Sequence, residues 1–180
     1  MTTFTAEHPR ASTDPGDPDL RTPHWRASTP FGEVVQITGQ RPLRNVVVGD
    51  GVPRVQLVTG AGAFPSPGVL ALESTFTFPM DLDVAGEPGT VDRPHGGAVP
   101  LLLTRRSRTI RVRLGEAEWL VRAGGRGAAA VTRGDSVVLE MSGRRLDRYR
   151  LDPAATPADL AVPLALTPVL GTLFPSLFLV

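Results

Sequence analysis

The sequence contains no cysteine and no lysine among its 180 residues. Without cysteine the chain can form neither a disulfide bond nor a thiolate metal site, and it has no cysteine nucleophile. All 19 basic residues are arginine, which together with abundant Ala, Gly, Pro and Val is typical of a high-GC bacterial genome. The arginine content is therefore no evidence that each arginine was selected for bidentate recognition of a ligand.

The motifs that identify common enzyme classes are missing as well. The sequence contains no P-loop, no GxGxxG after a strand pattern, no HExxH and no GxSxG. His95-Gly96-Gly97 resembles the oxyanion loop of esterases, but that loop works together with a nucleophile elbow, which this sequence lacks. We therefore predict a protein that is not an enzyme and that carries no cofactor.

The first 30 residues show no hydrophobic periodicity. Residues 1–30 are rich in Thr, Ser, Pro and Asp, a composition that predicts a disordered N-terminal arm. Trp25 is the exception, because an aromatic residue in such an arm often docks on its own domain or on a neighbouring subunit. The start of the sequence has no signal-peptide pattern, which predicts a cytoplasmic location or one at the periphery of a membrane.

From residue 31 onward the pattern changes to short β-branched runs separated by Gly, Pro and Asp. These runs predict strands at 33–38, 44–48, 54–59, 69–78, 107–114, 118–123, 128–132, 136–141 and 145–151. Closely spaced turns with glycine between them are typical of an antiparallel meander. The sequence therefore predicts one mostly β domain over 31–180, in which the meander closes into a barrel or a sandwich.

The C-terminal stretch 160–180 contains no charged residue. Ahead of it, Thr156, Pro157 and Asp159 supply an N-cap, a first-position proline and a first-turn acid, which together predict a helix start. Prolines and a glycine within the stretch argue against one straight membrane span. We therefore predict a broken apolar helix over 157–180 that packs inside the domain. A tail-anchored membrane protein is the alternative, because the stretch is long enough to cross a bilayer.

Short hairpins over 107–151, followed by the capped apolar segment 156–174, resemble the Tubby C-terminal-like fold of the scramblase and LURP-one type. The resemblance covers under half of the sequence, matches no diagnostic motif, and departs from the smooth helix of that family at its prolines. It implies a β-barrel closed around a hydrophobic terminal helix. It also implies a lipid-associated or membrane-associated binding module rather than a catalyst.

Charge is distributed unevenly along the sequence, although the net charge is only +1. Residues 1–103 carry 7 Arg against 11 Asp and Glu, whereas residues 104–150 carry 12 Arg against 5 acids. The candidate binding residues of the basic block are Arg105, Arg106, Arg108, Arg111 and Arg113. We predict a binding or structural module whose basic sheet face contacts an anionic membrane surface or an acidic protein. Few aromatics accompany these arginines, so nucleic acid is not the expected partner, and a homo-oligomeric assembly is an alternative function.

Acidic residues and one histidine gather in residues 79–99, which the sequence predicts to be a long loop. Asp81, Asp83, Asp92 and His95 are the candidate metal ligands, because carboxylate and imidazole groups are common ligands of divalent cations. A small hydrolase or metal enzyme at this loop is therefore a further alternative. A solvated acidic loop with turn-forming Gly and Pro is the simpler interpretation.

Overall fold

The computed structural model describes residues 1–7, 23–40, 43–58, 79–94, 109–124, 128–143, 146–167 and 170 of the chain. These residues form twelve strands and one helix. The strands are β1 (Thr2–Thr5), β2 (Pro23–Thr29), β3 (Gly32–Gln40), β4 (Leu43–Gly49), β5 (Val52–Val58), β6 (Met80–Val84), β7 (Glu87–Asp92), β8 (Thr109–Leu114), β9 (Ala117–Ala123), β10 (Ala129–Arg133), β11 (Ser136–Ser142) and β12 (Arg148–Leu151). The helix, α1, spans Pro157–Ala165.

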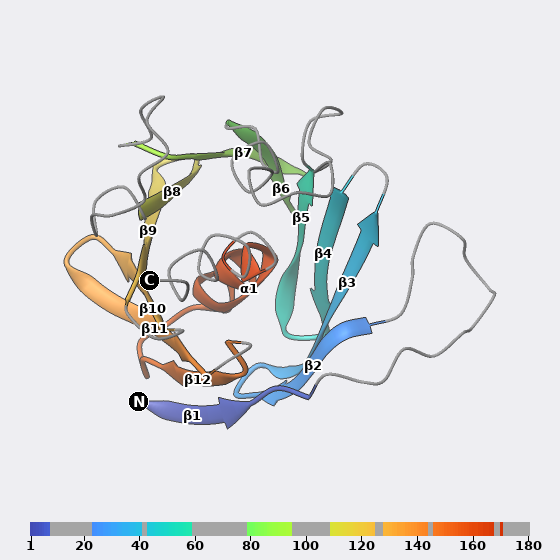
Figure 1. Ribbon diagram of the computed structural model, residues 1–180, viewed down its shortest axis with the longest axis vertical. Helices are drawn as coiled ribbons and strands as arrows, with labels where there is room; N and C mark the ends of the chain where they lie inside the picture. The colour runs from blue at the N-terminus through green and yellow to red at the C-terminus, as the bar shows by residue number, and fades with distance from the viewer. Residues whose placement is uncertain are drawn as a thin grey trace, which may run out of the picture.

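All twelve strands belong to one antiparallel sheet. From β2 to β12 each strand pairs with the next one in the sequence, and β1 pairs with β12. The sheet curls until β1 and β2 lie side by side, so it surrounds α1 as a barrel (Figure 1). The predicted fold class, a mostly β antiparallel meander that closes into a barrel or a sandwich, is confirmed, and the sheet takes the barrel form. The predicted strand at 69–78 lies outside the described residues.

Two sequence predictions about irregular segments are wrong for the residues that the structure describes. β1 and β2 lie within residues 1–30 and belong to the sheet, so the whole of that stretch is not a disordered arm. β6 and β7 form a hairpin within the predicted loop 79–99. Met80, Leu82 and Val84 are buried and alternate with exposed aspartates. Because Gly and Pro surround this segment, its alternating pattern is difficult to recognise in the sequence.

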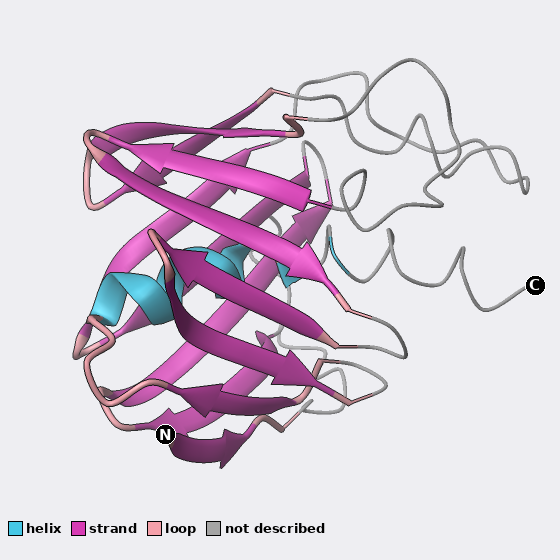
Figure 2. Ribbon diagram, turned by 90° about the vertical axis from the view of Figure 1, so that its left-hand side faces the viewer, coloured by secondary structure: helices cyan, strands magenta, loops and turns pink. Residues whose placement is uncertain are grey.

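Side chains alternate between the inside and the outside of the barrel, as the period of a strand requires. In β8, Ile110 and Val112 are fully buried, while Arg111 and Arg113 lie on the outer wall. The interior is filled by α1, whose residues from Asp159 to Ala165 are all buried. The two views of Figures 1 and 2 show the helix enclosed by the strands. The prediction that the apolar C-terminal element packs inside the domain is therefore confirmed for the described part of this element.

The helix begins where the sequence predicts. Thr156 is the N-cap, Pro157 follows it, and Asp159 completes a capping box with Thr156. The helix ends at Ala165, well before the end of the predicted segment, and it includes Pro163. Among the residues that the structure describes, no helix is long and apolar enough to cross a membrane.

Candidate functional site

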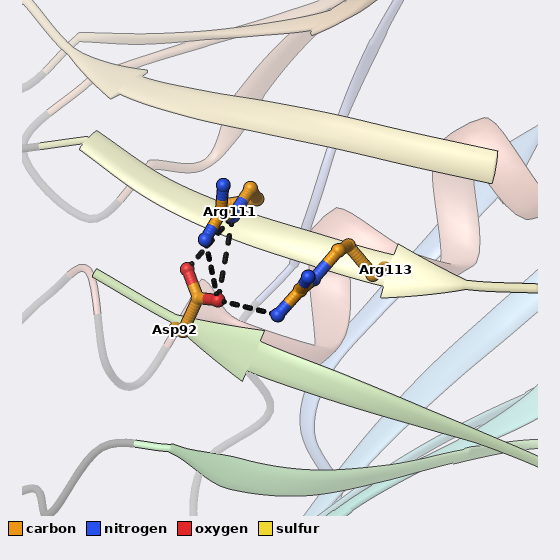
Figure 3. A network of polar contacts seen from close by, with 3 residues as sticks. All are labelled: Asp92, Arg111 and Arg113. Atoms are coloured by element: carbon orange, nitrogen blue, oxygen red, sulfur yellow. Dashed lines mark hydrogen bonds and ion pairs between the residues drawn. The ribbon is translucent and has the colours of Figure 1, made fainter. Parts of the chain in front are cut away.

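The outer wall of β7 and β8 carries a cluster of two arginines and one aspartate (Figure 3). Asp92 and Arg111 are register partners on neighbouring strands. Arg111 donates from Nε to Asp92 Oδ1 at 3.0 Å and from Nη2 to Asp92 Oδ2 at 2.9 Å. Arg113 donates from Nη2 to Asp92 Oδ2 at 3.0 Å. We call these three residues the Asp92 cluster.

The Asp92 cluster carries a net positive charge, because two guanidinium groups share one carboxylate. The hydrogen bonds to Asp92 raise the pKa of Arg111 above its usual value, so this side chain stays charged at any physiological pH. The Arg113 side chain is 52% exposed, whereas Asp92 is 20% exposed. Arg113 contacts Asp92 through a single nitrogen, so its other N–H groups can donate to a ligand.

One further arginine lies on the same wall. Arg122 on β9 is exposed and is the register partner of Thr109 on β8. Glu118 on β9 is exposed opposite Arg113 and offsets part of the positive charge. The outer wall of β7–β9 therefore presents three arginines against two acids.

The structure describes only part of the predicted binding face. Arg111 and Arg113 lie together on the outer wall, as their alternation predicts. Arg105, Arg106 and Arg108 lie outside the described residues, directly before β8 in the sequence. Sequence reasoning missed the partnership with Asp92, because it depends on the pairing of β7 with β8.

The candidate metal ligands are not brought together among the described residues. Asp81 and Asp83 are exposed on β6, and Asp83 Oδ1 accepts a hydrogen bond from the Gly86 backbone N–H. Asp92 is instead bound to two arginines. His95 lies outside the described residues, and the described part of the chain contains no group of three or more metal-binding side chains.

A second polar cluster lies inside the barrel, at the start of α1. Asp159 is fully buried, and its Oδ1 accepts a hydrogen bond from Trp119 Nε1 at 2.8 Å. Its Oδ2 accepts from the Thr156 backbone N–H at 2.7 Å and lies 3.3 Å from Arg133 Nη1. These partners satisfy a carboxylate that would otherwise be costly to bury.

The other end of α1 is held by amide side chains from the opposite wall. Gln36 Nε2 on β3 donates to the Leu164 carbonyl at 2.8 Å and to Thr167 Oγ1 at 2.9 Å. Asn45 Nδ2 on β4 donates to the Ala165 carbonyl. Because the last carbonyls of a helix have no partner within it, these amides satisfy groups that would otherwise be unpaired. Both ends of the helix are thus attached to the barrel, and the interior is a structural core.

Comparisons with protein-family models, with curated proteins and with solved structures found no match to this chain. A barrel around a terminal helix is the arrangement that the Tubby-like resemblance implies. The arrangement alone does not identify that family.

Proposed function

We propose that the protein is a non-enzymatic binding module that docks on anionic surfaces through the outer wall of β8 and β9. The observation that carries this proposal is the Asp92 cluster, in which one carboxylate orients two guanidinium groups. An arginine that is already held in place loses less conformational entropy when it binds a phosphate or a carboxylate. Arg122 on β9 extends the same wall.

A membrane with anionic lipids is the surface that we favour within this proposal. Each basic residue near such a membrane contributes about 1 kcal/mol of attraction. The exposed arginines are spread over two strands rather than gathered around one pocket. Several weak contacts with lipid headgroups match that spread, whereas a specific anion site would need converging donors.

Reversing the charge of two exposed arginines should weaken vesicle binding at least tenfold. We expect the full chain to float with phosphatidylserine vesicles at low salt and not with neutral vesicles. For Arg113→Glu combined with Arg122→Glu, the bound fraction should fall at least tenfold, since about 1 kcal/mol per residue corresponds to roughly fivefold each. Raising the salt to about 0.5 M should release the unmodified protein, because screening shortens the reach of surface charges.

The matched control is Arg54→Glu combined with Arg148→Glu, which changes the net charge by the same amount. Both residues are exposed and lie on other strands of the barrel, β5 and β12. We expect this variant to keep most of its vesicle binding. Equal flotation with anionic and neutral lipids would rule out the membrane version, and equal losses in the two variants would show that only net charge matters.

A homo-oligomeric assembly is the second candidate function, because a patch of apolar side chains lies on the outer wall of β3–β5. Val35 and Val48 are register partners there, Ile37 and Val46 form the next pair, and Val58 lies beyond them. Val46 is 5% exposed yet does not belong to the core cluster. An uncharged patch of this kind on the outside of a barrel is typical of protein–protein contact surfaces.

Light scattering coupled to size-exclusion chromatography tests this second candidate. If the β3–β5 wall is the interface, the full chain should elute as an oligomer, and Val35→Arg combined with Val48→Arg should elute as a folded monomer. The Arg113→Glu and Arg122→Glu variant is the control here, because both residues lie on β8 and β9, and it should keep the oligomeric state. A monomer at every protein concentration would exclude this candidate.

A further inference from the structure

The barrel closes between β1 and β2 with fewer backbone contacts than anywhere else in the described sheet. Every other pair of neighbouring strands shares at least four register pairs. At the junction of β1 and β2 the ladder is reduced to the single bridge between Glu7 and Arg26. Its two backbone hydrogen bonds are 2.8 and 3.0 Å long. We call this junction the β1–β2 seam.

Aromatic side chains close the inside of the seam. Phe4 on β1 stacks on Tyr149 of β12 with ring centroids 5.0 Å apart. Trp25 on β2 packs edge-on against the same ring at 5.4 Å and donates from Nε1 to the Tyr149 hydroxyl at 2.8 Å. Burial raises the pKa of Tyr149 well above its usual range, so the hydroxyl remains neutral. The Trp25–Tyr149 pair therefore holds β2 to β12 without help from β1.

The contacts that hold α1 are independent of β1. The N-terminal end of α1 is bound by Trp119 and Arg133 from β9 and β10, and its C-terminal end by Gln36 and Asn45 from β3 and β4. β1 itself has four residues, of which only Phe4 is partly buried. Segments with few buried apolar contacts open at a lower free energy than the whole domain.

We propose that β1 is a detachable strap, which leaves and rejoins the barrel at the β1–β2 seam while the other eleven strands stay closed around α1. Detachment breaks the ladder with β12, the Glu7–Arg26 bridge and the Phe4–Tyr149 stack. It also breaks the hydrogen bond from the Ala6 backbone N–H to the Asp147 carbonyl and exposes the buried Ala6 side chain. It frees one edge of β12 and uncovers the Trp25–Tyr149 pair to solvent. The barrel thus has a defined opening point that does not require release of the helix.

Hydrogen exchange measured by NMR on the full-length chain tests the strap. The backbone N–H groups of β1, and those of β12 that pair with β1, should exchange with solvent at least tenfold faster than the N–H groups of β8 and β9. The sequence has no cysteine, so Glu7→Cys combined with Arg26→Cys introduces one possible disulfide across the seam. Both side chains are exposed, and the two residues are the bridge partners of the seam.

The oxidised double variant should slow the exchange of β1 to the rate of β8 and β9, and the reduced form, as its matched control, should behave like the unmodified chain. Exchange of β1 at the same rate as β8 and β9 in the unmodified chain would overturn the proposal. Fast exchange that persists in the disulfide-linked form would also overturn it, because β1 would then be opening somewhere other than the seam.

Discussion

Truncation of the chain after Asp159 is expected to unfold the whole barrel. The removed segment contains Leu160, Leu164, Leu166 and Leu170, all of which are fully buried. At about 1.5–3 kcal/mol for each buried leucine, their loss approaches or exceeds a typical domain stability of about 5–15 kcal/mol. The truncation also removes the Leu164 and Ala165 carbonyls, which accept hydrogen bonds from Gln36 and Asn45 inside the barrel.

Far-UV circular dichroism and a thermal melt of the 1–159 chain measure this effect. Point variants make the result quantitative: Leu164→Ala should lower the free energy of unfolding by about 2–5 kcal/mol. The partly exposed Leu120 on the outer wall is the matched control, and Leu120→Ala should cost about 1 kcal/mol or less. A cooperative melt of the truncated chain near that of the full chain would show that the barrel does not depend on its helix.

Replacement of Asp159 should have the largest effect of any single charged residue in the described part of the chain. Asp159→Ala removes the acceptor of the buried Trp119 N–H and one half of the capping box. We expect the free energy of unfolding to fall by about 2–4 kcal/mol, from an unsatisfied buried donor and a lost cap together. Asp159→Asn keeps an oxygen acceptor and should cost less.

Urea unfolding of Asp159→Ala, of Trp119→Phe and of the double variant would measure this contribution. If the two side chains depend on each other, the double variant should lose less stability than the sum of the single variants. Asp135 is exposed in a turn, so Asp135→Ala is the control and should change stability by about 0.5 kcal/mol or less. A loss for Asp159→Ala no larger than that of this control would contradict the assigned role.

The sequence predicts the parts of this fold that follow local rules. Ser107 to Leu114 alternates apolar and polar residues, and the strand of this segment buries Ile110 and Val112 as expected. Thr156 caps the helix, because the cap, the first-position proline and the acid lie within four residues of one another. The outward position of Arg111 and Arg113 follows from the same alternation.

The remaining features depend on contacts between distant residues. β1 and β2 have little hydrophobic pattern of their own, and they belong to the sheet because Phe4 and Trp25 both pack on Tyr149. The contact between Asp92 and Arg111 depends on the pairing of β7 with β8, two segments that are separated in the sequence. Likewise, Gln36 reaches the helix across a sequence separation of 128 residues. Such pairings are fixed by the closure of the barrel, which no short window of the sequence encodes.

The claim that α1 is the internal element around which the sheet closes is tested most directly by the exchange rates of its own backbone N–H groups. In the full-length chain, the N–H groups of Leu160, Val162 and Leu164 have both burial and helical bonding to protect them. We predict that they exchange only when the whole domain unfolds, with the same free energy that urea unfolding gives. Exchange of these groups within seconds, while β8 and β9 remain protected, would contradict the claim.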